Sequence, residues 1–191
     1  MNRFNNRGYT VIEILTAITL GLIVLTSIYS LYSTSQKVSE RTSQEAELTQ
    51  NARIALDRIS REIRQTQEIL TDLPEDLDDP INPPANQIKF QDGHITAKIQ
   101  YIRYYLDGTN LHRSVNHYYF SSNPDEWVLW NATDSEGNPP TESVPDEDRT
   151  IGEFITNLQF YGIKLIDIDI EVGKDSTAYK FETKAMGRNI K

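Results

Sequence analysis

Residues 8–15 read GYTVIEIL, and they open a long apolar stretch that contains a single carboxylate, Glu13. After Glu13 the next charged side chain is Lys37. As a helix, residues 9–32 would span roughly 36 Å at about 1.5 Å per residue, which is enough to cross a bilayer core. The sequence therefore predicts a membrane-spanning helix that carries one acid near its N-terminal end.

The residues before this helix are polar and basic. Residues 1–8 carry Arg3 and Arg7, and positive charge on this flank favours a cytoplasmic N-terminus with the C-terminal bulk on the other side of the membrane. Tyr29 and Tyr32 fall at the far end, where aromatic side chains favour an interface. An ordinary secretory signal would have a shorter apolar core followed by a small-residue cleavage site, and this stretch has neither feature.

Composition excludes several classes of function. The chain has 191 residues, which suits one compact domain plus an appendage. Its formal net charge of −9 argues against a general nucleic-acid surface, because such a surface needs clustered lysine and arginine. The absence of cysteine excludes disulfides, thiolate nucleophiles and cysteine-based zinc sites.

The helical pattern continues beyond the membrane segment. Apolar residues recur at steps of three and four, which mark one face of a helix: Leu48, Ala52, Leu56, Ile59, Ile63 and, less regularly, Ile69 and Leu70. We expect residues 33–70 to extend the helix in water, with this stripe packed on a folded domain. A basic helix lying on lipid is the alternative, and the interleaved acids weaken it. The prolines and acids of residues 71–86 predict a surface loop.

Residues 87–191 switch to the period of two that is typical of strands. Asp92-Gly93 and Asp107-Gly108 are hairpin signals between apolar runs, and residues 126–130, EWVLW, predict a short strand. Residues 131–149 form a long acidic loop in this interpretation. The predicted fold class is α+β, with a long N-terminal helix packed on a C-terminal antiparallel sheet domain.

The last two strands are the clearest. In residues 165–172, LIDIDIEV, the aliphatic side chains alternate with Asp167, Asp169 and Glu171, so we expect these acids to form an exposed strand face. Residues 177–185, TAYKFETKA, should pair back on this strand.

Residues 7–15, RGYTVIEIL, resemble the processing site of type IV pilins and type II secretion pseudopilins. In that family a short basic leader ends in glycine, a prepilin peptidase cuts after it, and the new N-terminus is methylated. The resemblance implies cleavage between Gly8 and Tyr9 and N-methylation of Tyr9. It also places Glu13 at the fifth position of the mature chain, where the family keeps a glutamate. The family usually begins with Phe or Met, so Tyr9 departs from its pattern.

The resemblance gives the charge of Glu13 a use. A buried carboxylate needs an opposite charge close by. The amine created at Tyr9 of one subunit would meet Glu13 of a neighbour, so the charge is costly alone and compensated in an assembly. The implied partners are a prepilin peptidase, other pilins or pseudopilins, an inner-membrane assembly platform and membrane lipid. The implied location is single-pass in the inner membrane with an extracytoplasmic C-terminal domain, and then in a pilus or pseudopilus.

The order of elements narrows the resemblance to larger minor subunits. The runs NARIALDRISREIR, YYLDGTNLHRSV and NLQFYG, with a terminal MGRN, are similar to the J-type minor pseudopilins and the PilW-like pilin assembly proteins. The lack of cysteine departs from many major pilins, which close a C-terminal loop with a disulfide. A minor subunit that initiates or caps filament assembly is therefore implied, and the alternative is a membrane-anchored extracytoplasmic binding protein.

No other pattern predicts chemistry. His94, His112 and His117 lack metal-site spacing, and no nucleophile-elbow motif surrounds Ser114, so we expect no enzymatic activity and assign no metal ligands. Calcium is possible, because some pseudopilins bind it and one loop is rich in acids, but the spacing does not fit an EF-hand and a solvated loop is the preferred interpretation. The acids concerned are Asp134, Glu136, Asp146, Glu147 and Asp148.

Overall fold

The computed structural model describes residues 9–94, 98–175 and 177–187. They fall into two compact units divided between Glu45 and Ala46. Within the described ranges the chain forms one helix, α1 (Val11–Gln65), and ten strands: β1 (Ile88–Gln91), β2 (Tyr101–Asp107), β3 (Asn110–Asn116), β4 (Tyr118–Phe120), β5 (Asn123–Val128), β6 (Thr141–Glu142), β7 (Glu147–Gly152), β8 (Ile155–Tyr161), β9 (Leu165–Lys174) and β10 (Thr177–Met186).

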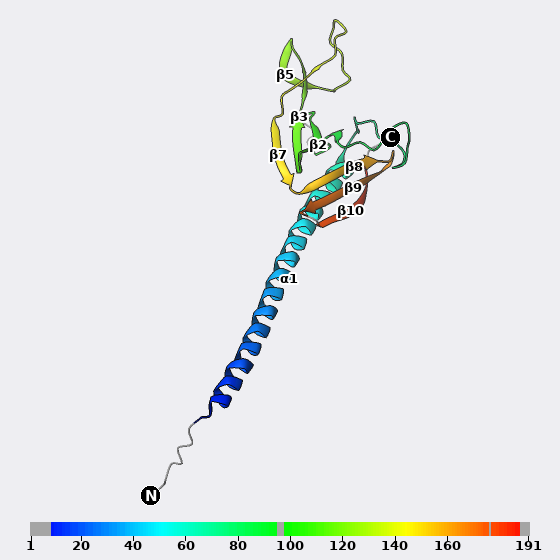
Figure 1. Cartoon of the computed structure of the whole chain (residues 1–191). Helices are drawn as coiled ribbons and strands as arrows, with labels where there is room; N and C mark the ends of the chain where they lie inside the picture. The colour runs from blue at the N-terminus through cyan, green and yellow to red at the C-terminus, as the bar shows by residue number, and fades with distance from the viewer. Residues whose placement is uncertain (1–8, 95–97, 176, 188–191) are drawn as a thin grey trace. The chain divides into compact units, whose positions relative to one another are not determined.

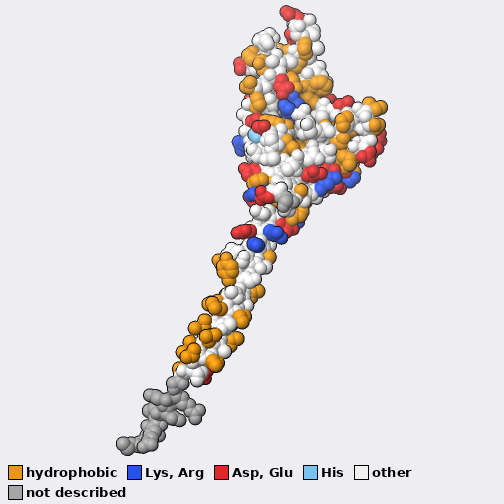
Figure 2. All heavy atoms as spheres, in the orientation of Figure 1, with side chains coloured by type: hydrophobic (Ala, Val, Ile, Leu, Met, Phe, Trp, Pro, Cys, Tyr) orange, Lys and Arg blue, Asp and Glu red, His pale blue; other side chains and the backbone are white. Residues whose placement is uncertain are grey.

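The first unit is helical from Val11, and its apolar side chains face outward. Figure 2 shows hydrophobic side chains along this part of the chain. Ile12, Leu20 and Leu31 are each more than half exposed. By length and composition α1 could span a membrane, and no residue of its most apolar window is buried. The predicted membrane-length helix is therefore present, and it exposes the apolar surface that such a helix would give to lipid or to other helices.

The second unit contains the antiparallel sheets of the predicted α+β fold. Their strand orders are β1-β2-β3-β7, β10-β9-β8 and β5-β4-β6. Figure 1 shows β8, β9 and β10 side by side. One core cluster joins the first two of these sheets to the stripe on α1, of which Leu48, Ala52, Ile59 and Ile63 are fully buried. The spacing of three and four in the sequence thus identified the packed face of the helix correctly.

The two hairpin signals behave differently. At Asp107-Gly108 the prediction is confirmed: β2 and β3 pair in continuous register, and Gly108 has a φ of 61°, which glycine adopts without strain. At Asp92-Gly93 β1 and β2 do pair, but β2 begins only at Tyr101, so no tight turn joins them. A Cβ on Gly93 would lie 1.8 Å from the carbonyl oxygen of Gln65, so this glycine instead allows the chain to pass the end of α1.

The helix ends at Gln65, earlier than the predicted residue 70. The Thr66 hydroxyl donates to the Gln91 carbonyl at 2.8 Å, and Ile69 forms an antiparallel bridge with Phe90. Ile69 and Leu70 therefore belong to an extended segment beside β1, not to the helical stripe. Pairing with a strand edge satisfies the backbone here and overrides helix propensity.

Two further expectations need correction. The acidic loop predicted for residues 131–149 contains β6, and its end forms the start of β7. The pairing of β9 with β10 is confirmed, but Asp169 is buried and only 3% exposed. Its strand is the central one of the sheet, and Lys180 Nζ lies 2.9 Å from Asp169 Oδ2 in an ionic contact that lacks hydrogen-bond alignment. The Glu182 and Asp169 carboxylates raise the pKa of Lys180, so this strand face is an ion-pair surface.

We predict that Ile59→Ala lowers the free energy of unfolding of the second unit by roughly 2–5 kcal/mol, because it leaves a cavity at a fully buried site. Ile54→Ala on the same helix is the matched control, since Ile54 is 52% exposed, and it should cost less than about 1 kcal/mol. Guanidinium unfolding followed by tryptophan fluorescence measures both. Equal losses would show that the packed face is assigned wrongly.

Candidate functional site

The N-terminal end of α1 holds a reciprocal pair of hydrogen bonds between Thr10 and Glu13. The Thr10 backbone N–H donates to Glu13 Oε2 at 3.0 Å, and the Glu13 backbone N–H donates to Thr10 Oγ1 at 3.3 Å. The Thr10 hydroxyl also donates to Glu13 Oε2 at 3.1 Å. This arrangement is a capping box, which satisfies backbone donors that the helix itself leaves unpaired.

Sequence reasoning missed this pair, although its signal was present. Residues 10–13 read TVIE, and a threonine followed three residues later by a glutamate is the capping-box pattern. The membrane-length stretch indicated the energetic cost of the Glu13 charge but not the hydrogen bonds that its carboxylate makes within the chain. Glu13 therefore has a hydrogen-bonding role within a single chain, before any partner is considered.

The structure describes only part of the predicted processing site. Arg3, Arg7 and Gly8 lie outside the described residues. Tyr9 is 85% exposed and lines a shallow groove of about 520 Å³ together with Glu13, Ile14, Ala17 and Ile18. The small side chain of Ala17, one turn after Glu13, helps to keep this groove open. Tyr9 and Glu13 thus share one apolar surface, but the hydrogen bonds of Glu13 go to Thr10.

Several hydroxyl groups farther along the apolar segment donate hydrogen bonds within the helix. The acceptor is a backbone carbonyl three or four residues earlier, as for Thr19 with Leu15 at 2.6 Å and Ser27 with Ile23 at 2.8 Å. The same bond is made by Thr16, Thr26 and Thr34. Such bonds lower the cost of polar side chains in an apolar medium. Glu13 is the one carboxylate or basic side chain between Tyr9 and Gln36, and within the described part of the chain its hydrogen bonds go to the neutral Thr10.

A second polar cluster ties α1 to the first sheet inside the second unit. Arg113 Nε lies 3.0 Å from both carboxylate oxygens of Glu62, and the Tyr104 hydroxyl donates to Glu62 at 2.7 Å. Burial and the Glu62 carboxylate raise the pKa of the Tyr104 phenol far above its usual value. Burial opposes the charge of Arg113, but the Glu62 carboxylate outweighs it and raises the pKa of this guanidinium. The cluster fixes which face of α1 meets the sheet.

The histidines pair with single carboxylates. His112 Nδ1 lies 2.8 Å from Asp148, and His117 Nδ1 lies 2.7 Å from Asp146, while His94 is 3.5 Å from Asp92. Ser114 is buried, and it shows no hydrogen bond to either neighbouring histidine. In the described ranges no group of three or more histidine and acidic side chains is placed to hold a metal ion.

The acids considered for calcium have separate partners. Asp146 and Asp148 bond histidines, and Glu147 pairs with Arg113 at 3.3 Å. Asp134 accepts the backbone N–H of Asn138, which with other local hydrogen bonds lowers the pKa of that carboxyl. The loop therefore distributes its carboxylates over several contacts and does not gather them around one point.

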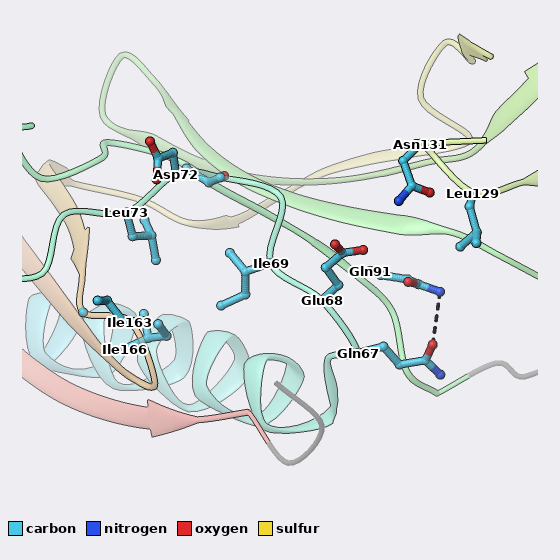
Figure 3. Close-up of a pocket in the computed structure, with 12 residues that line it drawn as sticks. Gln67, Glu68, Ile69, Asp72, Leu73, Gln91, Leu129, Asn131, Ile163 and Ile166 are labelled. Atoms are coloured by element: carbon cyan, nitrogen blue, oxygen red, sulfur yellow. Dashed lines mark hydrogen bonds between the residues drawn. The ribbon is translucent and has the colours of Figure 1, made fainter. Parts of the chain in front are cut away.

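A groove of about 790 Å³ lies beside the extended segment that follows α1 (Figure 3). Its polar groups bond one another or nearby side chains: Gln91 Nε2 donates to Gln67 Oε1 at 3.2 Å, and Glu68 accepts the indole N–H of Trp130 at 3.1 Å. Ile69, Leu73, Ile163 and Ile166 supply its apolar wall, and no histidine, lysine or arginine lines it. Thr71, Asp72 and Glu68 also line the groove, and in the described residues no hydrogen bond joins the Thr71 hydroxyl to either carboxylate.

No protein-family model matches the sequence, and no curated protein matches it.

We predict that Arg113→Met destabilises the second unit by roughly 3 kcal/mol, the lower end of the range for breaking a buried ion pair, because it leaves the Glu62 carboxylate, 13% exposed, with only the more exposed Arg58 at 3.5 Å. Adding Glu62→Gln should recover part of this loss, since it removes the stranded charge and keeps an acceptor for Tyr104. Arg61→Met is the control: its partner Asp57 and Arg61 itself are 69% and 67% exposed, so the change should cost less than about 1 kcal/mol. Urea unfolding of these three variants and of Glu62→Gln alone measures the coupling, which would be absent if the pair were unimportant.

Proposed function

We propose that the chain is a minor pilin or pseudopilin, a non-enzymatic subunit that helps to initiate or cap a type IV pilus or a type II secretion pseudopilus. The observation that carries this proposal is the placement of Glu13. It is the single carboxylate in the exposed apolar part of α1, and it stands at the fifth position after Gly8. Gly8 ends the proposed leader, which contains two arginines. The α+β layout of the chain is compatible with a pilin-like fold.

Each residue at this end of the chain has a role in the proposal. A prepilin peptidase cuts between Gly8 and Tyr9 on the cytoplasmic side and methylates the amine of Tyr9. Arg3 and Arg7 hold the leader in the cytoplasm during insertion. In the assembled filament, Glu13 of one subunit pairs with the Tyr9 amine of another, and the exposed apolar face of α1 packs on neighbouring helices in place of lipid.

One observation favours the rival function, a single-pass membrane-anchored binding protein. The capping box with Thr10 gives Glu13 a use that needs no neighbour. A substitution such as Glu13→Ala would remove both the cap and the charge, so it would impair either protein. The two functions are separated by a change that removes only the charge.

Glu13→Gln is that change, because a glutamine at this position of a capping box still accepts the backbone N–H. We predict that Glu13→Gln inserts into the membrane as well as the unchanged chain does, but that its amount in sheared filaments is at least about tenfold lower. The reason is that breaking an ion pair in an apolar medium costs more than the 1.4 kcal/mol that corresponds to a tenfold change. The measurement is the ratio of filament to membrane fractions when the variant is the only copy in the cell.

Thr10→Ala is the matched control, since it weakens the cap and keeps the charge. It should reduce assembly less than Glu13→Gln does. If Glu13→Gln assembles normally while Thr10→Ala and Glu13→Ala fail equally, capping is the whole role of Glu13 and its charge takes no part in assembly. If the unchanged chain itself is absent from sheared filaments and stays in the membrane fraction, the anchor function is correct.

We also predict that the mature chain begins at Tyr9 and carries one methyl group on its amine. Mass spectrometry of the protein purified from membranes measures both properties. Gly8→Glu should leave the leader attached, because the resemblance places glycine at the cut, whereas Gly21→Ala should leave processing unchanged. A mature wild-type chain that retains residues 1–8 would overturn the proposal.

A further inference from the structure

Arg103 stands on the face of the first sheet that points away from α1. On β2, the alternate residues Ile102 and Tyr104 belong to the core cluster, and Tyr104 reaches Glu62 on the helix. Arg103 therefore faces the other side, where it is half-buried. Its cross-strand neighbours are Lys89 on β1 and Ser114 on β3.

The pairing of Arg103 with Lys89 sets two cations directly opposite each other, which is unfavourable unless anions compensate them. Lys89 is compensated: its Nζ lies 2.7 Å from Glu142 and also donates to the Tyr118 hydroxyl. Burial and the Glu142 carboxylate raise the pKa of Tyr118 to about 12, so this phenol stays protonated and adds no negative charge. Glu142 thus compensates Lys89 and forms no ion pair with Arg103.

The bonds of Arg103 go to neutral groups. Its Nε donates to Gln87 Oε1 at 2.9 Å, and one terminal nitrogen donates to the same oxygen. Its guanidinium carbon lies 4.8 Å from the centre of the Tyr105 ring. Across the described ranges Arg103 forms no ion pair, and its other terminal nitrogen donates no hydrogen bond. A half-buried guanidinium is therefore held in place by an amide and an aromatic ring, and among the described residues no carboxylate contacts it directly. Asp148 lies beyond the Tyr105 ring, where hydrogen bonds from His112 and Tyr105, with a smaller contribution from the charge of Arg103, lower the pKa of its carboxyl.

Arg103 also lines two neighbouring pockets. The one on the Tyr105 side has a volume of about 450 Å³, and Arg103 is its only charged lining residue. Asn86, Gln87 and Asn157 supply amide groups to its wall. The other pocket, of about 370 Å³, lies on the Lys89 side and shares Gln87 and Arg103 with the first. In a chain of net charge −9, a pocket whose sole charge is positive selects for an anion.

We infer that this pocket binds an acidic segment of a partner protein, with a side-chain carboxylate of that segment on Arg103. A planar guanidinium matches the two oxygens of a carboxylate, and Gln87 and Tyr105 already fix its orientation. The amides of Asn86 and Asn157 can donate to and accept from a peptide backbone, which a bare inorganic anion does not offer. The pocket volume lies within the range of ligand sites.

The test measures the binding of a fluorescent peptide, GSDEDSG, to the full chain dispersed in a zwitterionic detergent, by fluorescence anisotropy. The amide-matched peptide GSNQNSG is the ligand control. We expect the acidic peptide to bind and the amide peptide to bind at least about tenfold more weakly, because charge-assisted hydrogen bonds carry the recognition. Binding should weaken as salt is added. Dispersed chains do not assemble, so the result is independent of the filament proposal.

The variants identify the site. Arg103→Gln should lower the affinity for the acidic peptide at least about tenfold. Arg103→Lys should lower it less, because lysine keeps the positive charge and loses only the planar arrangement of donors that binds two carboxylate oxygens. Arg149→Gln is the matched control: it removes one positive charge from a side chain that is 70% exposed and lines neither pocket, and it should change affinity less than twofold. Near-ultraviolet circular dichroism of each variant verifies that the fold is kept.

Four outcomes would overturn the inference. Equal binding of the two peptides, or equal losses in Arg103→Gln and Arg149→Gln, would show that the attraction is not specific to this pocket. Free glutamate that competes as well as the peptide would show a small-carboxylate site. Anionic phospholipid vesicles that bind through Arg103, with no binding of the peptide, would show a lipid-headgroup site.

Discussion

The structure depends on one constraint, the need of Glu13 for a partner in a stretch, residues 9–35, whose other side chains are apolar or carry only hydroxyl groups. A charge transferred to an apolar medium costs several kcal/mol unless hydrogen bonds or an opposite charge compensate it. The capping box with Thr10 supplies the hydrogen bonds, but Thr10 is neutral and leaves the charge itself unmatched. The cap therefore stabilises the Glu13 carboxylate in an isolated helix, and a neighbouring cation would stabilise it further.

The same reasoning applies to polar groups in the second unit, with a different result. Glu62 is also a carboxylate on α1, but the second unit supplies Arg113 and the Tyr104 hydroxyl from strands of its own sheet. Its charge is thus compensated inside the fold, and it specifies packing. Arg103 is the reverse case, since the described part of the fold holds its guanidinium through Gln87 and Tyr105 and puts no carboxylate in direct contact with it. A charged side chain that is paired inside the fold helps to fix its packing. A charged side chain that no counter-ion contacts is a candidate for binding a partner of opposite charge.

Much of the fold could be predicted because the patterns were local. The stripe from Leu48 to Ile63, the hairpin at Gly108 and the alternation in β9 each follow from residues close in sequence, and all three are present. The predictions were wrong where contacts between segments distant in the sequence determine the structure. Ile69 joins the edge of β1 because Phe90 is there, and Asp169 is buried because its strand is central in the sheet. Arg103 showed no signal, because its pairing with Lys89 depends on strand register, which the sequence did not specify.

The two uses of Glu13 are compatible if the chain is processed as proposed, because a cut would change what surrounds the carboxylate. In the uncut chain the nitrogen of Tyr9 is a neutral amide, and among the described residues the carboxylate is stabilised by the cap and by the positive end of the helix dipole. A cut after Gly8 would place an ammonium group one residue before Thr10, at the end of the helix where the dipole disfavours a cation. Glu13 is then needed to offset that ammonium, and each helix end carries a cation and an anion. When two such helix ends lie side by side, the Glu13 carboxylate of each chain can pair with the Tyr9 ammonium of the other, and no charge is left unpaired. A charge that is costly in one helix could in this way favour the association of several helices.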